Sequence, residues 1–98
     1  MIERNINGII VNQRGRDNYF LLKNILAVCR KGKFSLKKYK KSKSTKRFLK
    51  HLKKEHNIKK PFKPERKEKW VSPLVALDML YQACPKMRSD ILAYANFF

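Results

Sequence analysis

The stretch that decides the fold runs from Arg30 to Lys69 and reads RKGKFSLKKYKKSKSTKRFLKHLKKEHNIKKPFKPERKEK. It holds nineteen Lys or Arg against three Glu, and therefore carries +16 of the +18 net charge of the chain. Apolar residues recur within it: Phe34, Leu36, Tyr39, Phe48, Leu49, Leu52, Ile58 and Phe62. Charge interleaved with apolar anchors indicates a folded surface that meets a polyanion, and a merely solvated basic face is the alternative.

The rest of the chain is apolar and flanks this basic stretch. Its 98 residues predict one small domain over residues 1–98 with one modest core. Residues 1–29 and 70–98 supply most of the apolar side chains, so we expect them to build that core. No apolar run reaches the length of about 18 residues that a membrane span needs. The first residues lack the pattern of a signal peptide, which favours an intracellular protein.

The two cysteines predict reduced thiols. Cys29 and Cys84 lie far apart in the sequence, each in apolar surroundings. An intracellular pair in such surroundings is more typical of core thiols than of a disulfide.

A β-hairpin followed by a helix is predicted before the basic stretch. Residues 5–12 are rich in β-branched side chains and predict a strand. Polar residues 14–18 then predict a turn, and residues 19–21 the returning strand. From residue 22 to residue 31 the apolar spacing becomes helical, and Gly32 is suited to end that helix.

Two helices are predicted inside the basic stretch. The first covers residues 36–41, and the polar residues 42–44 break it. The second covers about residues 46–56, with Ser44 or Thr45 as its N-cap, since a side-chain oxygen there accepts a hydrogen bond from an unpaired N–H group.

The second of these helices has two distinct faces. Phe48, Leu49 and Leu52 fall on one stripe. The opposite side and its flanks are basic: Lys46, Arg47, Lys50, Lys53 and Lys54. A short helix, a polar break and an amphipathic helix with a basic ridge predict a helix-turn-helix-like pair.

Residues 57–69 predict a basic hairpin wing. Pro61 and Pro64 exclude a helix here, and we expect short strands at residues 58–62 and 69–71. A disordered loop is the alternative, and both interpretations hold if the segment orders only on a ligand.

Two C-terminal helices complete the predicted α+β fold. Ser72 as N-cap and Pro73 at the first helical position predict a helix to about Ala83. That helix is apolar nearly all round, so we expect it to be the most buried one. Cys84 and Pro85 then begin a last helix, which we expect to carry the domain to the end of the chain.

The C-terminal third is similar to the second half of the KilA-N domain. The resemblance rests on residues 70–78, WVSPLVALD, and on residues 84–87, CPKM. Upstream, residues 18–21 and 43–49 look like the start of the first and second main helices of that family. Tyr39 stands where the family usually has Trp. The likeness therefore covers essentially the whole chain in the right order.

Three positions depart from the family pattern: Ser72 replaces the usual His, Leu21 the usual Asn and Cys84 the usual Ser. The resemblance implies a DNA-binding module of phages and large DNA viruses, related to the fungal APSES domain. It also implies an α+β fold in which a basic helix and a hairpin wing approach the duplex. A viral source would place the protein in the cytoplasm or nucleus of a host cell.

Together these features predict a non-enzymatic protein that grips double-stranded DNA mainly by its phosphates. Lysine greatly outnumbers arginine in the basic stretch. Because lysine lacks the planar guanidinium that hydrogen-bonds the guanine edge twice, low sequence specificity is expected. Arg47 and then Arg66 are the candidates for base contacts. The predicted DNA-binding residues are Lys37, Lys38, Lys40, Lys41, Lys43, Lys46, Arg47, Lys50, Lys53, Lys54, Lys59, Lys60, Lys63, Arg66 and Lys67.

Other functions remain as weaker alternatives. An RNA-binding or ribosome-associated protein would fit the charge, but Tyr19 and Phe20 are the only candidates for base stacking and we expect them in the core. Neither clustered carboxylates nor zinc-ligand spacing is present, and His51 and His56 are five residues apart, which puts them off one helical face. We therefore expect no catalysis, metal, cofactor or membrane partner. A homodimer remains open.

Overall fold

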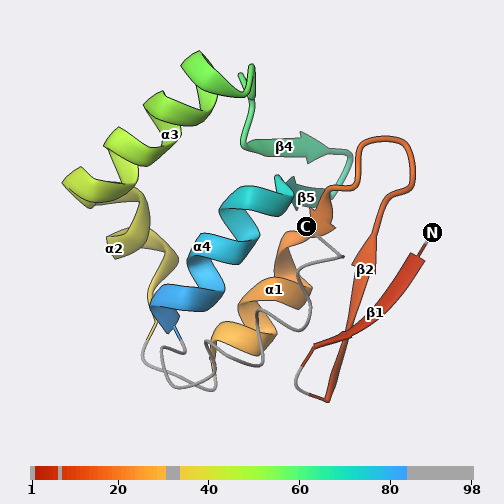
Figure 1. Ribbon diagram of the computed structural model, residues 1–98. Coiled ribbons are helices and arrows are strands. Elements are labelled where there is room, and N and C mark those ends of the chain that lie inside the picture. The colour runs from red at the N-terminus through yellow and green to blue at the C-terminus, as the bar shows by residue number, and fades with distance from the viewer. Residues whose placement is uncertain (1, 7, 31–33, 84–98) are drawn as a thin grey trace.

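The computed structural model of the chain describes residues 2–6, 8–30 and 34–83. Antiparallel strands and helices build a mixed α+β fold (Figure 1), which confirms the predicted fold class. The elements of the described residues are, in chain order, β1 (Ile2–Ile6), β2 (Ile9–Gln13), β3 (Phe20–Leu21), α1 (Leu22–Cys29), α2 (Leu36–Lys41), α3 (Lys43–Glu55), β4 (Phe62–Glu65), β5 (Glu68–Val71) and α4 (Pro73–Ala83).

The N-terminal part of the sheet holds a strand that the sequence analysis missed. The predicted single strand over residues 5–12 is wrong, because β1 and β2 form an antiparallel hairpin in which Ile6 pairs with Ile9. Gly8 adopts a φ of +82°, which glycine reaches without the steric cost of a side chain. The predicted hairpin across residues 14–18 is present as the pairing of β2 with β3, with Gln13 opposite Phe20.

The strands follow the order β1-β2-β3-β5-β4, so the second hairpin, β4–β5, joins the sheet through β3. The prediction of a strand at residues 58–62 is wrong by several positions, since β4 starts at Phe62. The predicted strand at residues 69–71 is confirmed within β5. Pro64 is tolerated in β4 because that strand lies at the edge of the sheet and needs fewer N–H donors.

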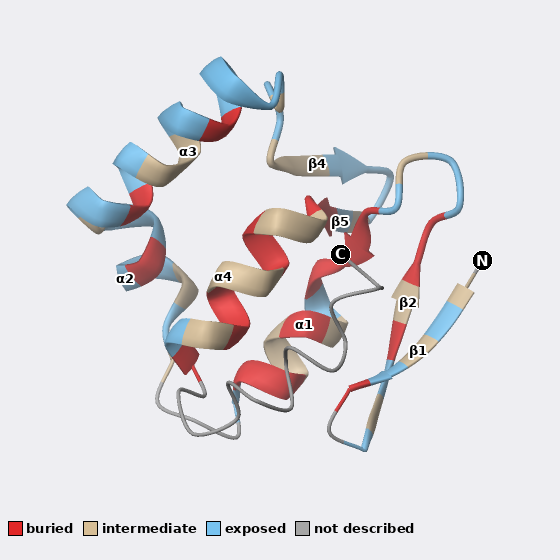
Figure 2. Ribbon diagram, viewed as in Figure 1, coloured by how far each residue is buried: buried red, intermediate tan, exposed pale blue. Residues whose placement is uncertain are grey.

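The core lies where α1 packs against the sheet on one side and against α4 on the other (Figure 2). The predicted helix from residue 22 ends at Cys29, with Arg30 as its C-cap, and the predicted stop at Gly32 lies outside the described residues. Cys29 is fully buried; Cys84 and the predicted last helix also lie outside the described residues. The buried apolar core residues are Ile6, Val11, Phe20, Leu22, Ile25, Val28, Cys29, Tyr39, Leu52, Val71, Val75, Ala76, Met79, Leu80 and Ala83.

Helix α4 begins at Pro73 and reaches Ala83, as predicted. It lies between α3 and α1 (Figure 1), in keeping with its apolar sequence. Ser72 lies directly before α4, as predicted, but its buried hydroxyl has no hydrogen-bond partner among the described residues, so the predicted side-chain cap is wrong. The backbone carbonyl of Ser72 accepts from the Ala76 N–H at 2.9 Å and so makes the first helical hydrogen bond.

Helix α2 has the predicted bounds, and the Ser35 side chain caps it by accepting from the Lys38 N–H. Helix α3 starts earlier than predicted, at Lys43, so Ser44 and Thr45 lie inside the helix and the cap predicted for them is wrong. Ser42 alone separates the two helices, in an extended conformation. Among the described helices, none is long and apolar enough to cross a membrane.

Candidate nucleic-acid interface

The basic ridge of α3 points away from the rest of the molecule. Leu52 is 2% exposed and Thr45 1% exposed on its inner side, where Phe48 and Leu49 also pack against the core. The predicted two-faced helix is therefore confirmed, with Thr45 as an inward position that the apolar pattern did not show. The outer side is basic and exposed: Lys43, Lys46, Arg47, Lys50, Lys53 and Lys54.

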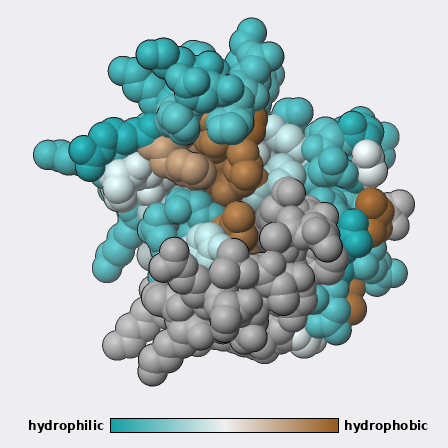
Figure 3. Space-filling view, in the orientation of Figure 1, coloured by the Kyte–Doolittle hydropathy of each residue, from teal (hydrophilic) through white to brown (hydrophobic). Residues whose placement is uncertain are grey.

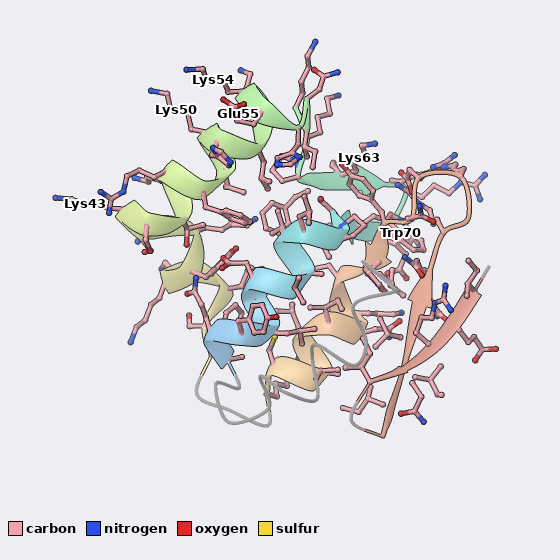
Figure 4. All side chains as sticks on the ribbon, viewed as in Figure 1. Lys43, Lys50, Lys54, Glu55, Lys63 and Trp70 are labelled. Carbon is pink, nitrogen blue, oxygen red and sulfur yellow. The ribbon has the colours of Figure 1, made fainter. Side chains whose placement is uncertain are left out.

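Figures 3 and 4 show this arrangement from one side. In Figure 4, Lys43, Lys50 and Lys54 extend from α3 away from α4. In Figure 3, hydrophilic atoms cover the position of α3 and hydrophobic atoms lie beneath it. An amphipathic helix with this orientation offers its cations to solvent while its apolar stripe fixes the helix to the core.

Helix α2 packs against α3 and is anchored by one aromatic side chain. Tyr39 is 3% exposed, and its hydroxyl donates a hydrogen bond to Asp78 on α4. Burial, and then the Asp78 carboxylate, raise the pKa of Tyr39 above its ordinary value, so the hydroxyl stays protonated. The lysines of α2 are exposed around this anchor: Lys37, Lys38, Lys40 and Lys41.

The segment between α3 and β5 carries further cations. The Tyr19 hydroxyl donates to the Lys60 carbonyl at 2.8 Å and holds the loop before β4. The ammonium group of Lys63 lies 4.3 Å from the centroid of the Tyr19 ring, a cation–π contact. Arg66 and Lys67 form the turn between β4 and β5, and Arg66 has a φ of +56°.

The structure exposes fourteen of the fifteen predicted DNA-binding residues and leaves Lys63 half-buried. Lys63 is also the one among them that forms an ion pair within the described residues, at 3.5 Å from Asp17. Most of these cations therefore lack a fixed protein counter-charge in the described part of the chain. They lie on α2, α3 and the segment that leads through β4 to the Arg66–Lys67 turn.

Arg14 is a central residue that the sequence analysis missed. It is 8% exposed, and its guanidinium lies 4.5 Å from the centroid of the Trp70 ring. Its Nη2 and Nε atoms donate to the two carboxylate oxygens of Asp17 at 2.7 and 3.2 Å. Its Nη1 donates to Glu65, which also accepts from Arg16. Arg14 thus joins the turn after β2 to the end of β4.

The acidic residues of the basic stretch have partners that the sequence did not indicate. Three glutamates lie among the cations of that stretch, and two of them pair with residues outside it. Glu65 pairs with Arg14 and Arg16, and Glu68 pairs with Lys23 at 3.3 Å. Both glutamates therefore bind cations from the N-terminal third of the chain and do not neutralise the described cations of the basic stretch, among which Lys63 pairs with Asp17.

Asp17 has a lowered pKa within this network. Burial by itself would raise the pKa of the carboxyl. The Tyr19 N–H, which donates to it at 3.1 Å, and the neighbouring Arg14 and Lys63 outweigh that effect, so the pKa of Asp17 lies below its ordinary value of 3.8. The carboxylate is consequently ionised and paired at neutral pH.

A groove of about 510 Å³ lies between the turn after β2 and the β4 strand. Its lining mixes both signs of charge: Arg14, Arg16, Asp17, Lys60, Lys63, Pro64 and Glu65. The carboxylates inside it make the groove a poor site for a free anion, and we treat it as part of the contact between the two loops.

The two histidines lie closer together than their spacing suggested. The rings of His51 and His56 are 5.8 Å apart between centroids and meet edge to face at 69°. The two histidines do not share a helical face, since His56 follows the last helical residue, but their rings lie close together at the end of α3. Within the described residues, no group of three His, Cys, Asp or Glu side chains could hold a metal ion.

These features define a small, strongly basic α+β domain with an exposed cationic helix. Comparison with known protein families matches residues 2–88 to the KilA-N domain. The chain belongs to the KilA-N family, and the resemblance predicted from its sequence is confirmed. KilA-N domains are generally DNA-binding domains. Comparisons with curated proteins and with solved structures found no match.

Proposed function

We propose that the protein is a non-enzymatic binder of double-stranded DNA that holds the duplex mainly through its phosphates. The observation that carries this proposal is the outer side of α3, where the basic residues are exposed while Thr45 and Leu52 are buried on the inner side. An exposed basic ridge on a fixed helix can follow a phosphate backbone, and the release of counterions from the duplex favours binding.

In this proposal α2, Ser42 and α3 act as a helix-turn-helix-like pair, and β4–β5 acts as a wing. The geometry that supports it is the packing of α2 on α3 and the exposed Arg66–Lys67 turn at the far end of the wing. Thirteen of the fifteen predicted residues belong to these segments, and Lys59 and Lys60 lie in the loop that joins α3 to β4. α3 would lie against one groove while the wing reaches the neighbouring backbone.

Low sequence specificity follows from the chemistry of these side chains. Thirteen of the fifteen residues are lysines, and a lysine ammonium is a point charge that binds phosphate without selecting a base. Arg47 and Arg66 carry the planar guanidinium that can bind a guanine edge with two hydrogen bonds. We expect their contribution to base selection to be secondary to the phosphate contacts.

The aromatic side chains favour duplex DNA over single-stranded RNA as the ligand. Tyr19 is 8% exposed and Phe20 fully buried, so neither can stack on a base. Ile10 is the large apolar residue that is exposed among the described ones, and no Phe, Tyr or Trp ring in that part of the chain is exposed. Single-stranded recognition usually requires such exposed rings.

Competition binding tests the proposal. The full chain is bound to a labelled duplex, then challenged with the same duplex, a scrambled duplex and a structured RNA at one salt concentration. We expect both duplexes to compete equally and the RNA to compete less well. Equal or better competition by the RNA would contradict the choice of DNA, and a large difference between the duplexes would contradict low specificity.

A further inference from the structure

We propose that Glu65, an acidic residue at the end of β4, strengthens DNA binding because it positions the β4–β5 hairpin. This inference rests on the proposed function. It assigns a role in DNA binding to Glu65, whose negative charge makes direct contact with phosphates unfavourable. The geometry that points to it is the clamp formed by Arg14, Arg16 and Glu65 between the turn after β2 and the hairpin.

Each of the three guanidinium nitrogens of Arg14 donates a hydrogen bond, and one face of the group is covered. Asp17 accepts hydrogen bonds from Nε and Nη2, and Glu65 accepts one from Nη1. The centroid of the Trp70 ring lies 4.5 Å from the guanidinium carbon, and the ring covers one face of the group. Arg14 is therefore unsuited to contact DNA even though it is an arginine of a basic protein. Its contacts instead fix the position of Glu65 relative to Trp70 of β5, because the planar guanidinium donates its hydrogen bonds in fixed directions.

The hairpin needs such a fixed point because of its place in the sheet. β4 is an edge strand of four residues, and in the described part of the chain its strand partner is β5. Short edge strands open readily, since few backbone hydrogen bonds hold them. Glu65 is the last residue of β4 and directly precedes the Arg66–Lys67 turn. A contact at Glu65 consequently sets where those two cations lie.

Electrostatics alone predicts the opposite role for Glu65. A carboxylate beside a cationic surface repels phosphate, so its removal should tighten DNA binding. Neutralising Glu65 would also release Arg14 and Arg16 from their ion pair. The direction in which DNA affinity changes therefore distinguishes the two roles. If Glu65 positions the hairpin, removing its carboxylate weakens binding, whereas if Glu65 acts only through its charge, binding becomes tighter.

The test compares Glu65→Gln with Glu55→Gln in the full chain. Glu55 is exposed at the end of α3 and forms no ion pair in the described part of the structure, so it is a matched control for the loss of one negative charge. We expect Glu65→Gln to weaken duplex binding by roughly 3–10-fold, and Glu55→Gln to leave it equal or up to about threefold tighter.

The salt dependence of binding provides a second measurement that a change in stability would not alter. If the hairpin cations disengage in Glu65→Gln, the slope of log K against log salt should become shallower by about 1–2. Glu65→Asp keeps the charge and withdraws the carboxylate by one methylene, so positioning predicts partial loss of affinity and charge alone predicts none. If Glu65→Gln does not fold, Glu65→Asp distinguishes the positioning role from a purely electrostatic one.

Hydrogen exchange in the free protein separates this inference from the proposed function. We expect faster exchange of β4–β5 amides in Glu65→Gln and unchanged exchange in α4. A wild-type chain that does not bind DNA would contradict the proposed function. A wild-type chain that binds, together with a Glu65→Gln variant that binds as tightly as Glu55→Gln, would overturn the positioning role alone.

Discussion

The hydroxyl of Tyr39 and the carboxylate of Asp78 lie 2.7 Å apart, and their hydrogen bond joins α2 to α4 across 39 positions of the chain. Asp78 also accepts from Gln82 at 3.1 Å. Since α2 packs on α3, this contact fixes the helix pair to the core as well as anchoring one tyrosine. The position of the basic ridge therefore depends on a polar contact beneath it.

Tyr39→Phe should lower the free energy of unfolding by about 1–2 kcal/mol, because it removes a hydrogen bond to a charged acceptor and keeps the ring. Urea denaturation measures the change. Gln82→Ala is the control, since it removes an exposed donor to the same carboxylate and should change stability by less than about 0.5 kcal/mol. Equal losses of stability in the two variants would contradict a larger contribution of the Tyr39–Asp78 hydrogen bond.

Thr45→Val should leave stability unchanged or raise it by up to about 1 kcal/mol, because the hydroxyl of Thr45 is buried and has no hydrogen-bond partner in the part of the chain that the structure describes. Valine has nearly the same shape and fills the same inward position on α3. Thermal unfolding monitored by circular dichroism measures the change, with Ser44→Ala as an exposed control. A clear loss of stability in Thr45→Val would mean that the hydroxyl is bonded in solution.

The network around Asp17 predicts a dependence of stability on acid. Since the pKa of Asp17 in the folded chain lies below its ordinary value of 3.8, its ionised form stabilises the fold. That contribution is fully present above the ordinary value and is lost as the pH falls through the lowered pKa. Wild type should therefore exceed Asp17→Asn in stability by a constant amount from about pH 5 to pH 7, and the difference should shrink below about pH 4. A difference that does not vary with pH would exclude the ion pairs as its cause.

The double variant Arg47→Ala/Lys50→Ala should weaken duplex binding about tenfold or more at low salt and leave the circular dichroism spectrum native, because both side chains are exposed on the outer side of α3. Arg30→Ala removes one exposed arginine at the C-cap of α1, outside the proposed interface, and serves as the control. An unchanged binding curve for the α3 variant would remove this helix from the interface.

Local patterns were sufficient to predict the helices of the interface. Leu36 and Tyr39 lie three positions apart and placed α2 with the bounds that the structure has. The proline after Ser72 likewise placed the start of α4. The start of α3 was missed because Lys43 and Ser44 stand in a polar segment that is typical of the link between two helices, although a helix tolerates both residues. The Asn7-Gly8 pair is a turn signal that was read as strand interior, and this error hid the β1–β2 hairpin.

The contacts that orient the hairpin could not be predicted from local patterns. Arg14 and Glu65 are separated by 51 positions, and their pairing depends on β3 bringing β2 and β5 into one sheet. An arginine in a predicted turn looks like a solvent-exposed charge until its burial on Trp70 is known. Ion pairs between distant segments follow from the fold and leave no spacing signal in the sequence.

The most direct test of the central claim is a salt titration of duplex binding by the wild-type chain, carried out with one duplex and its scrambled counterpart. If six to eight of the exposed cations neutralise phosphates, log K should fall against log salt with a slope of roughly −5 to −7, and the slope should be similar for both sequences. A slope near zero would contradict the account, because the basic surface would then not be the surface that contacts DNA.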